Sequence, residues 1–201
     1  LDHDYLERDS SRHIMATVVF NGRCEATVPA FTQLDALSDT PHWGMSKTTV
    51  PDYNRTNWSR SIVWRKGKYF LQFDKLEATE DGDFIFDVGF RMSSWPENRQ
   101  RMIDGRTFLA EREIPKASDE NLIEDTTKRF IIQSADMVNM FAYNEWVDRL
   151  QRNRMYIRQR KEASLQKGQS RSFASLLVPT APGRRGSYEI HRIGPRAFFI
   201  S

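Results

Sequence analysis

The stretch that decides the fold reads WSRSIVWRKGKYFLQFD over residues 58–74 and EDGDFIFDVGF over residues 80–90. Successive side chains of a β-strand point to opposite faces, so alternation of apolar and polar residues indicates a half-buried strand. Lys66-Gly67 lies where a tight hairpin needs a residue that accepts positive φ. A second turn is expected at residues 80–83. These signals predict a three-stranded antiparallel meander.

The third of these strands has one face that is wholly apolar. Phe84, Phe86, Val88 and Phe90 share that face, because they alternate with the other residues of the strand. Burying each such side chain contributes roughly 1.5–3 kcal/mol, so this face must be covered. A single meander cannot cover it, whereas a second sheet packed on the first can.

Strand signals continue along the rest of the chain. Residues 14–20 are rich in β-branched side chains and are followed by the hairpin dipeptide Asn21-Gly22, with a return strand over residues 23–28. A pair of short strands is predicted within residues 101–114, around Asp104-Gly105, and further strands at residues 129–134, 138–143, 154–165, 172–178, 187–192 and 196–200. The prediction is an all-β protein, a large antiparallel β-sandwich of the supersandwich kind with about a dozen strands.

We expect residues 1–201 to form a single β-sandwich domain. The chain has no internal repeat and no low-complexity linker, and 39% hydrophobic residues suffice for a large core. Because the sequence starts at Leu1 without a methionine or a signal peptide, we expect it to be a fragment of a longer chain.

Charge and hydropathy argue against two classes of partner. The formal net charge is only +3, so we expect no nucleic-acid binding, which needs a concentrated basic face. No apolar run is long enough to span a bilayer, so we expect no membrane partner. The densest basic stretch contains Arg149, Arg152, Arg154, Arg158 and Arg160. Acidic residues flank it, which favours a solvated strand face over a polyanion site.

No catalytic motif, metal site or cofactor site is predicted. His3 and His13 are separated by acids, but their spacing matches no zinc pattern. The chain has only four histidines and one cysteine, Cys24, so few positions could form a histidine-based site. We therefore assign no catalytic residue, no metal ligand and no cofactor.

The candidate binding residues lie in residues 29–57, which we predict to be a long connection with short strand pieces at most, and at the start of the strand that follows. Aromatic side chains on loops can stack on the apolar C–H faces of sugar rings. The candidate carbohydrate-binding residues are His42, Trp43, Tyr53, Trp58 and Arg60. The alternative is that the aromatic side chains plug the open end of the sandwich, and that Arg60 simply stacks or pairs on its strand face.

Several segments along the chain carry a resemblance to a known family. The runs NWSRSIVW (57–64), KGKYFLQFD (66–74) and DGDF (81–84) resemble the "W-x-R-x-hydrophobic, K-G-x-Y-F, D" pattern of the heparinase II/III-like proteins. The run SRHIMATVVFNG (11–22) is similar to that family's "His, Thr-Val, Asn-Gly" hairpin. The late runs KGQSRSFASLLV (167–178) and YEIHR (188–192) are similar to its last strands.

The resemblance implies a polysaccharide lyase in which an α/α toroid precedes a C-terminal β-sandwich, and which cleaves uronic-acid polymers by β-elimination. The family's His-x-His-x-Asp segment is missing here, since His3-Asp4 does not match it. No catalytic histidine or zinc ligand is therefore carried over. The expected role is the non-catalytic sandwich portion, inert alone, that supports or lines an acidic-polysaccharide cleft. Its expected partners are an acidic polysaccharide and the missing N-terminal helical domain, in the periplasm or outside the cell.

Chemistry read from the residues leaves further alternatives. β-Elimination needs a base and a group that stabilises the carboxylate, and Tyr53 with His42 or Arg60 are the residue types available. A free-standing carbohydrate-binding module would show Trp43, Tyr53 and Trp58 as an exposed coplanar row. A purely structural or interaction domain would instead bury Trp43, Trp58 and Trp64.

Overall fold

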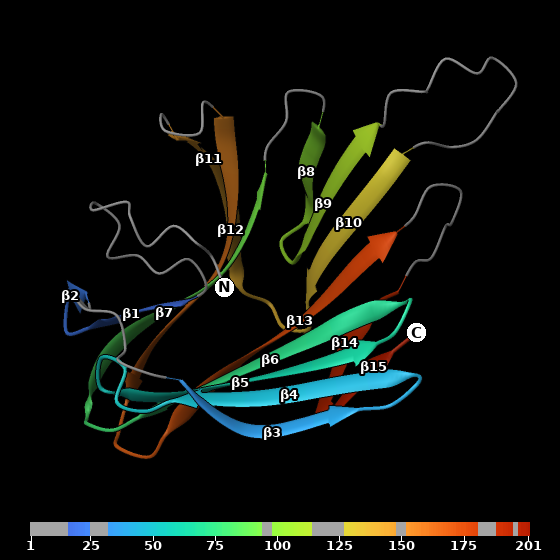
Figure 1. Cartoon of the computed structure of the whole chain (residues 1–201). Coiled ribbons are helices and arrows are strands. Elements are labelled where there is room, and N and C mark those ends of the chain that lie inside the picture. The colour runs from blue at the N-terminus through green and yellow to red at the C-terminus, as the bar shows by residue number, and fades with distance from the viewer. Residues whose placement is uncertain are drawn as a thin grey trace, which may run out of the picture.

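The computed structural model describes residues 16–24, 32–93, 98–113, 127–147, 152–180, 188–194 and 197–201. These ranges contain fifteen strands and no helix (Figure 1). The strands are β1 (Ala16–Phe20), β2 (Arg23–Cys24), β3 (Gln33–Asp39), β4 (Trp43–Val50), β5 (Thr56–Arg65), β6 (Tyr69–Ala78), β7 (Gly82–Ser93), β8 (Asn98–Asp104), β9 (Thr107–Glu113), β10 (Thr127–Ser134), β11 (Asn139–Val147), β12 (Arg152–Leu165), β13 (Ser170–Thr180), β14 (Ile190–Gly194) and β15 (Ala197–Ile200).

Two large antiparallel sheets form the sandwich. The first has eight strands in the order β3-β4-β5-β6-β13-β10-β9-β8, and the second has five in the order β11-β12-β7-β1-β2. A separate two-stranded sheet pairs β14 with β15. The predicted all-β sandwich is therefore confirmed.

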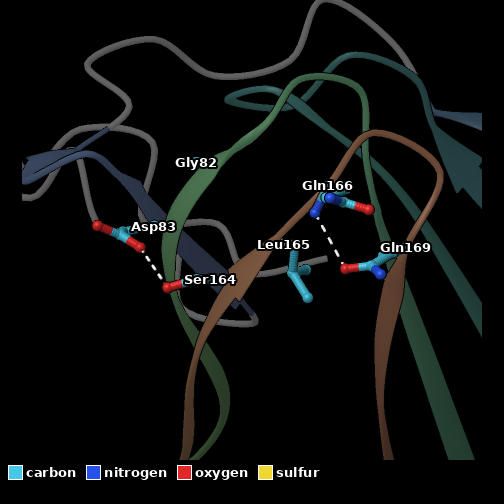
Figure 2. A pocket seen from close by; sticks show the side chains of 6 residues that line it. All are labelled: Gly82, Asp83, Ser164, Leu165, Gln166 and Gln169. Carbon is cyan, nitrogen blue, oxygen red and sulfur yellow. Dashed lines mark hydrogen bonds between the residues drawn. The ribbon is translucent and has the colours of Figure 1, made fainter.

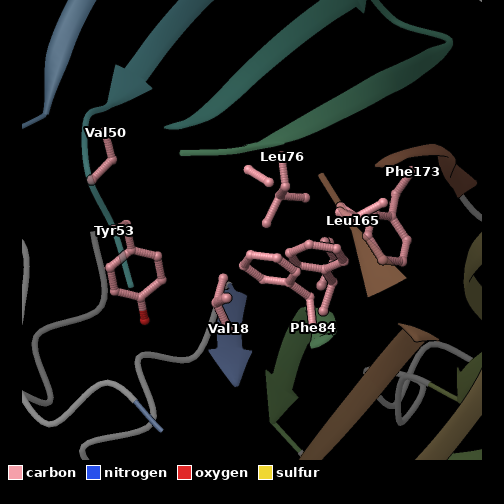
Figure 3. Packing of buried hydrophobic residues seen from close by; sticks show 10 residues of the cluster. Val18, Val50, Tyr53, Leu76, Phe84, Leu165 and Phe173 are labelled. Atoms are coloured by element: carbon pink, nitrogen blue, oxygen red, sulfur yellow. The ribbon is translucent and has the colours of Figure 1, made fainter. Parts of the chain in front are cut away.

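The main core lies between the two large sheets. Val18 of β1 and Phe84 of β7 meet Leu76 of β6 and Phe173 of β13, and all four are essentially inaccessible to solvent (Figure 3). A second cluster continues this core toward β9 and β10, where Phe108 and Ile132 pack with Ile157 of β12. Phe84, Phe86, Val88 and Phe90 are all buried, as the alternation of β7 predicted.

The predicted meander is only partly right. β5 and β6 form the expected hairpin, with Arg65 opposite Tyr69 and Gly67 at φ 73°. β7, however, pairs with β1 and β12 in the other sheet. The second side of β6 is already occupied by β13, with Phe73 opposite Ala174, so the chain crosses between sheets after β6. A turn signal specifies a reversal of direction but not the strand that follows as a neighbour.

The prediction of a long connection over residues 29–57 is wrong in the part that the structure describes. β3 and β4 lie there, and β4 pairs with β5 over its whole length, from Trp43 opposite Arg65 to Val50 opposite Trp58. The strand signal of β3 and β4 is weak because β3 is a largely exposed edge strand and β4, next to it, is only partly buried. A β-bulge at Asp35 interrupts the outer pair, as is common for protected edges.

The hairpin of β14 and β15 covers the second face of the eight-stranded sheet (Figure 1). Ile190 is fully buried against Ala174 and Leu176. Ring contacts extend this cluster, with Phe73 5.8 Å from Phe198 between centroids. The eight-stranded sheet is therefore covered on both faces near β6 and β13, whereas β3 is largely exposed and β4 is partly exposed.

Candidate functional site

Tyr53, one of the candidate sugar-binding residues, belongs to the core. It is only 4% exposed, and its ring lies 6.2 Å from that of Trp58 in the cluster drawn in Figure 3. Tyr53 therefore takes no part in the exposed aromatic row that a free-standing binding module would show, because the turn between β4 and β5 folds its ring into the sandwich. The same burial removes it as an accessible base.

Trp58 and Arg60 are joined through a buried carboxylate. Asp74 is 1% exposed and accepts hydrogen bonds from Trp58 Nε1 at 2.8 Å, Arg60 Nε at 2.7 Å and Gln72 Nε2 at 2.8 Å. The Arg60 guanidinium also lies over the Trp58 ring, 4.7 Å from its centroid. Arg60 thus stacks and pairs on its strand face, which is the alternative that the sequence left open.

His42 and Trp43 lie at the opposite end of the β4–β5 ladder. Trp43 is paired with Arg65, whereas Trp58 is paired with Val50, seven residues further along β4. At about 3.3 Å per residue, the two tryptophans are about 23 Å apart along the sheet. The five candidate residues therefore fall into two groups, a buried one around Asp74 and an exposed one around His42.

The exposed group is built from two neighbouring turns. The His42 carbonyl accepts hydrogen bonds from the Lys66 amide at 3.1 Å and from Arg65 Nη1 at 3.3 Å. Trp43 is 43% exposed, the Arg65 guanidinium lies 4.8 Å from its ring centroid, and Tyr69 contacts it edge-on at 6.4 Å. This end of the sheet combines cations with accessible indole surface.

A second exposed tryptophan at this end was not among the candidates. Trp64 is 39% exposed, and its ring stacks on that of Phe70 at 5.4 Å and 9°. The Lys66 ammonium lies 5.5 Å from the Trp64 centroid. The alternation of β5 was the available signal, since it places Trp64 and Arg65 on opposite faces of a strand that ends in a cationic turn.

The arginine stretch of β12 is not simply solvated. Arg158 is buried and donates from Nη1 to Thr17 Oγ1 at 3.2 Å. Arg160 makes a two-point contact with Asp87, at 2.8 Å from both Nε and Nη2. The hydrogen bond to Asp87 raises the pKa of Arg160 against the opposing effect of burial. The expectation of a solvated strand face is wrong for Arg158, and the side chains of Arg149, Arg152 and Arg154 lie outside the description.

A shallow pocket lies at the β12–β13 turn beside the start of β7 (Figure 2). Its lining residues are Gly82, Asp83, Ser164, Leu165, Gln166 and Gln169. Asp83 accepts a hydrogen bond from Ser164 Oγ at 2.5 Å, and Gln169 Oε1 accepts from the Gln166 amide at 3.0 Å. The lining holds a single carboxylate and no second titratable group, so it lacks the pair that acid–base catalysis needs.

The described ranges offer neither a metal site nor a membrane-spanning helix. No group of three or more His, Cys, Asp or Glu side chains is placed there to hold a metal ion. The same ranges contain no helix long and apolar enough to cross a membrane. His3 and His13 lie outside these ranges.

The comparisons with known proteins place this fold. No protein-family model and no curated protein matches the sequence. Among solved structures, the heparan sulfate lyase HepC from Pedobacter heparinus is similar over 89% of this chain, with a TM-score of 0.62 and 15% identity. A structure of Heparinase III is similar over 87% of the chain, with a TM-score of 0.61 and 10% identity.

This chain has the fold of a segment of heparinase III. It spans about a quarter of the length of those proteins, 26% of HepC and 24% of the Heparinase III structure. At such low identity the likeness establishes the fold alone. It confirms the fold expected from the resemblance of the β5–β7 region to heparinase II/III-like sequences.

Proposed function

We propose that this chain is the non-catalytic β-sandwich portion of a heparinase II/III-like polysaccharide lyase, where it supports or lines a cleft for an acidic polysaccharide. The observation that carries the proposal is the likeness of nearly nine tenths of the chain to about a quarter of a heparan sulfate lyase. Catalysis then belongs to the remainder of such a protein, which acts by β-elimination. The proposed partners are the polysaccharide and a helical domain of the same protein, in the periplasm or outside the cell.

The described side chains support a lining role. Tyr53 is inside the core and Arg60 is engaged by Asp74, so neither is available to act on a substrate. The exposed side chains at the end of β4 and β5 are indoles and cations, the groups that suit sugar C–H faces and acidic substituents.

The alternative function, a free-standing carbohydrate-binding module, lacks the exposed aromatic row that it requires. An exposed row would need Trp43, Tyr53 and Trp58 side by side, but Tyr53 is buried and Trp58 is bonded to Asp74. The purely structural alternative is favoured by the same burial. It is opposed by Trp43 and Trp64, which remain substantially exposed.

A titration separates the two remaining functions. The chain is titrated with heparan sulfate and with alginate while tryptophan fluorescence is followed. A saturable change supports the cleft-lining function, and its reduction in Trp43→Ala or in Trp64→Ala locates the contact at the His42 end. The absence of any change with either polymer overturns it and leaves a structural domain.

A further inference from the structure

Four residues form a row across the exposed end of the eight-stranded sheet. Asp39 of β3 is opposite Gly44 of β4, Gly44 is opposite Trp64 of β5, and Trp64 is opposite Phe70 of β6. Residues that are opposite each other on neighbouring strands share a face of the sheet. We name Asp39, Gly44, Trp64, Phe70 and the nearby Lys66 the Gly44 site.

Gly44 contributes no side chain of its own beside the Trp64 indole, so the Asp39 side chain of the next strand is the neighbour on that side. A methyl group added at Gly44 would touch Trp64 Cε3 and Asp39 Oδ1, each at 3.5 Å, which is ordinary van der Waals distance. Phe70 occupies the other side of the indole by stacking on it. One face of Trp64 is therefore supported, while the space over Gly44 is bounded by an indole and a carboxylate.

A cation spans this space. Lys66 Nζ forms an ion pair with Asp39 Oδ1 at 2.5 Å and lies 5.5 Å from the Trp64 ring centroid. The Asp39 side chain is 70% exposed, so this ion pair is in contact with water and is weak. Arg65 and Lys68 flank Lys66 in the same turn, which gives it three cations in four residues.

The opposite face of the same strands offers no equivalent. There Trp43, Arg65 and Tyr69 form a continuous row in which the guanidinium lies over the indole and the phenol ring contacts its edge. Tyr69 is further packed against Tyr188 at 5.2 Å. Side chains already fill that row, whereas the row through Gly44 has a gap at its second strand.

We propose that the Gly44 site binds one acidic sugar residue, resting on the proposed function of lining a polysaccharide cleft. The apolar face of the sugar ring stacks on the Trp64 indole over Gly44. The acidic substituent replaces Asp39 as the partner of Lys66, so a weak exposed ion pair is exchanged for a ligand contact. The combination of a partly exposed indole with a cation that can exchange its partner selects an acidic saccharide over a neutral one or an acidic peptide.

The test is a set of charge-matched and shape-matched variants titrated with heparan sulfate, alginate and polyglutamate. Gly44→Ala, Trp64→Ala and Lys66→Gln should each weaken binding of the polysaccharides at least about fivefold. Asp39→Asn should strengthen binding about twofold by releasing Lys66. Lys75→Gln and Asp52→Asn make the same charge changes away from the site and should alter affinity less than about twofold.

Gly44→Ala keeps every tryptophan and charge, so it distinguishes loss of the site from loss of folding when thermal unfolding is measured alongside. Effects in both polysaccharides identify a carboxylate as the acidic group, and effects in heparan sulfate alone identify a sulfate. Either result supports the proposal.

If wild type binds the polysaccharides, but Gly44→Ala and Lys66→Gln each change the affinity less than about twofold, the site is wrong while the cleft-lining function stands. If wild type binds neither polysaccharide, the proposed function itself fails. Polyglutamate binding that equals polysaccharide binding and is unaffected by Trp64→Ala overturns the saccharide in favour of an acidic protein segment.

Discussion

Trp58 and Asp74 lie diagonally on neighbouring strands, and the indole Nε1 donates a hydrogen bond of 2.8 Å to the carboxylate. This hydrogen bond connects Trp58 of β5 to a buried carboxylate on β6. Asp74 also receives Arg60 and Gln72, so three donors converge on one buried acid. A buried carboxylate is tolerated only with such compensation.

Replacing Asp74 should therefore destabilise the fold strongly. Asp74→Asn removes the negative charge and leaves the Arg60 guanidinium, whose side chain is 12% exposed, without its carboxylate. We expect a loss of about 3 kcal/mol in the free energy of unfolding, measured by urea denaturation. Asp39→Asn, which removes an exposed partner of Lys66, should change it by less than about 0.5 kcal/mol. Equal effects of the two substitutions would contradict a structural role for the Asp74 network.

Replacing glycine by alanine should change the free energy of unfolding in opposite directions at Gly82 and at Gly44. A methyl group at Gly82 would lie 2.3 Å from Phe20 Cε2, and the Phe20 ring is packed on Phe84 at 5.0 Å. Gly82→Ala should therefore cost about 1–3 kcal/mol. Gly44→Ala meets only ordinary contacts and should stabilise by about 0.4–1 kcal/mol. Thermal unfolding of the two variants decides the matter, and a stabilised Gly82→Ala would show that Phe20 moves freely.

The burial of β7 was predictable from sequence because it depends only on alternation within one strand. Its strand partners were not predictable, because Asp81 and Gly82 signal a turn without specifying which sheet the next strand joins. β3 and β4 were missed for a related reason. Ser46, Lys47 and Thr48 look like loop residues, yet they form a strand because β5 supplies a partner.

The sequence named candidate residues for the site but could not tell which of their side chains are exposed, because exposure also depends on how the strands pair. Loop aromatics suggested Tyr53 and Trp43 equally, but only folding shows that Tyr53 turns inward and Trp43 outward. Asp74 ends a recognisable strand segment, yet nothing local indicates that Trp58, Arg60 and Gln72 converge on it. Contacts across strands need the register, and the register is a property of the whole sheet.

Among the substitutions considered, the largest loss of stability is expected on the inner face of β7, which is buried in the core. Phe86 is fully buried and stacks on Phe84 at 5.4 Å between centroids. Phe86→Ala should lower the free energy of unfolding by about 3–5 kcal/mol, because it removes a buried ring and leaves a cavity. Ile85→Ala on the opposite face of the same strand is the control and should cost clearly less. Similar losses in the two variants would mean that β7 is buried equally on both faces.

Asp136 links the C-terminal hairpin to the sandwich, and its ion pairs should make the stability of the fold depend on pH. Arg192 of β14 and Lys161 of β12 both donate hydrogen bonds to its carboxylate. Burial alone would raise the pKa of Asp136, but these hydrogen bonds and charges outweigh it and hold the pKa below the ordinary 3.8. Since the folded pKa is depressed, the unfolded chain takes up this proton more readily.

The resulting stability is therefore present above the ordinary aspartate pKa and is lost as pH falls through the lower, folded value. Thermal unfolding followed from about pH 6 to about pH 3 should show a fall that is smaller in Asp136→Asn than in wild type. At neutral pH the variant should already be less stable, because Arg192 and Lys161 lose their shared carboxylate. Asp52→Asn, at an exposed turn, serves as the control and should keep the wild-type pH profile. An unchanged profile in Asp136→Asn would show that other carboxylates dominate acid unfolding.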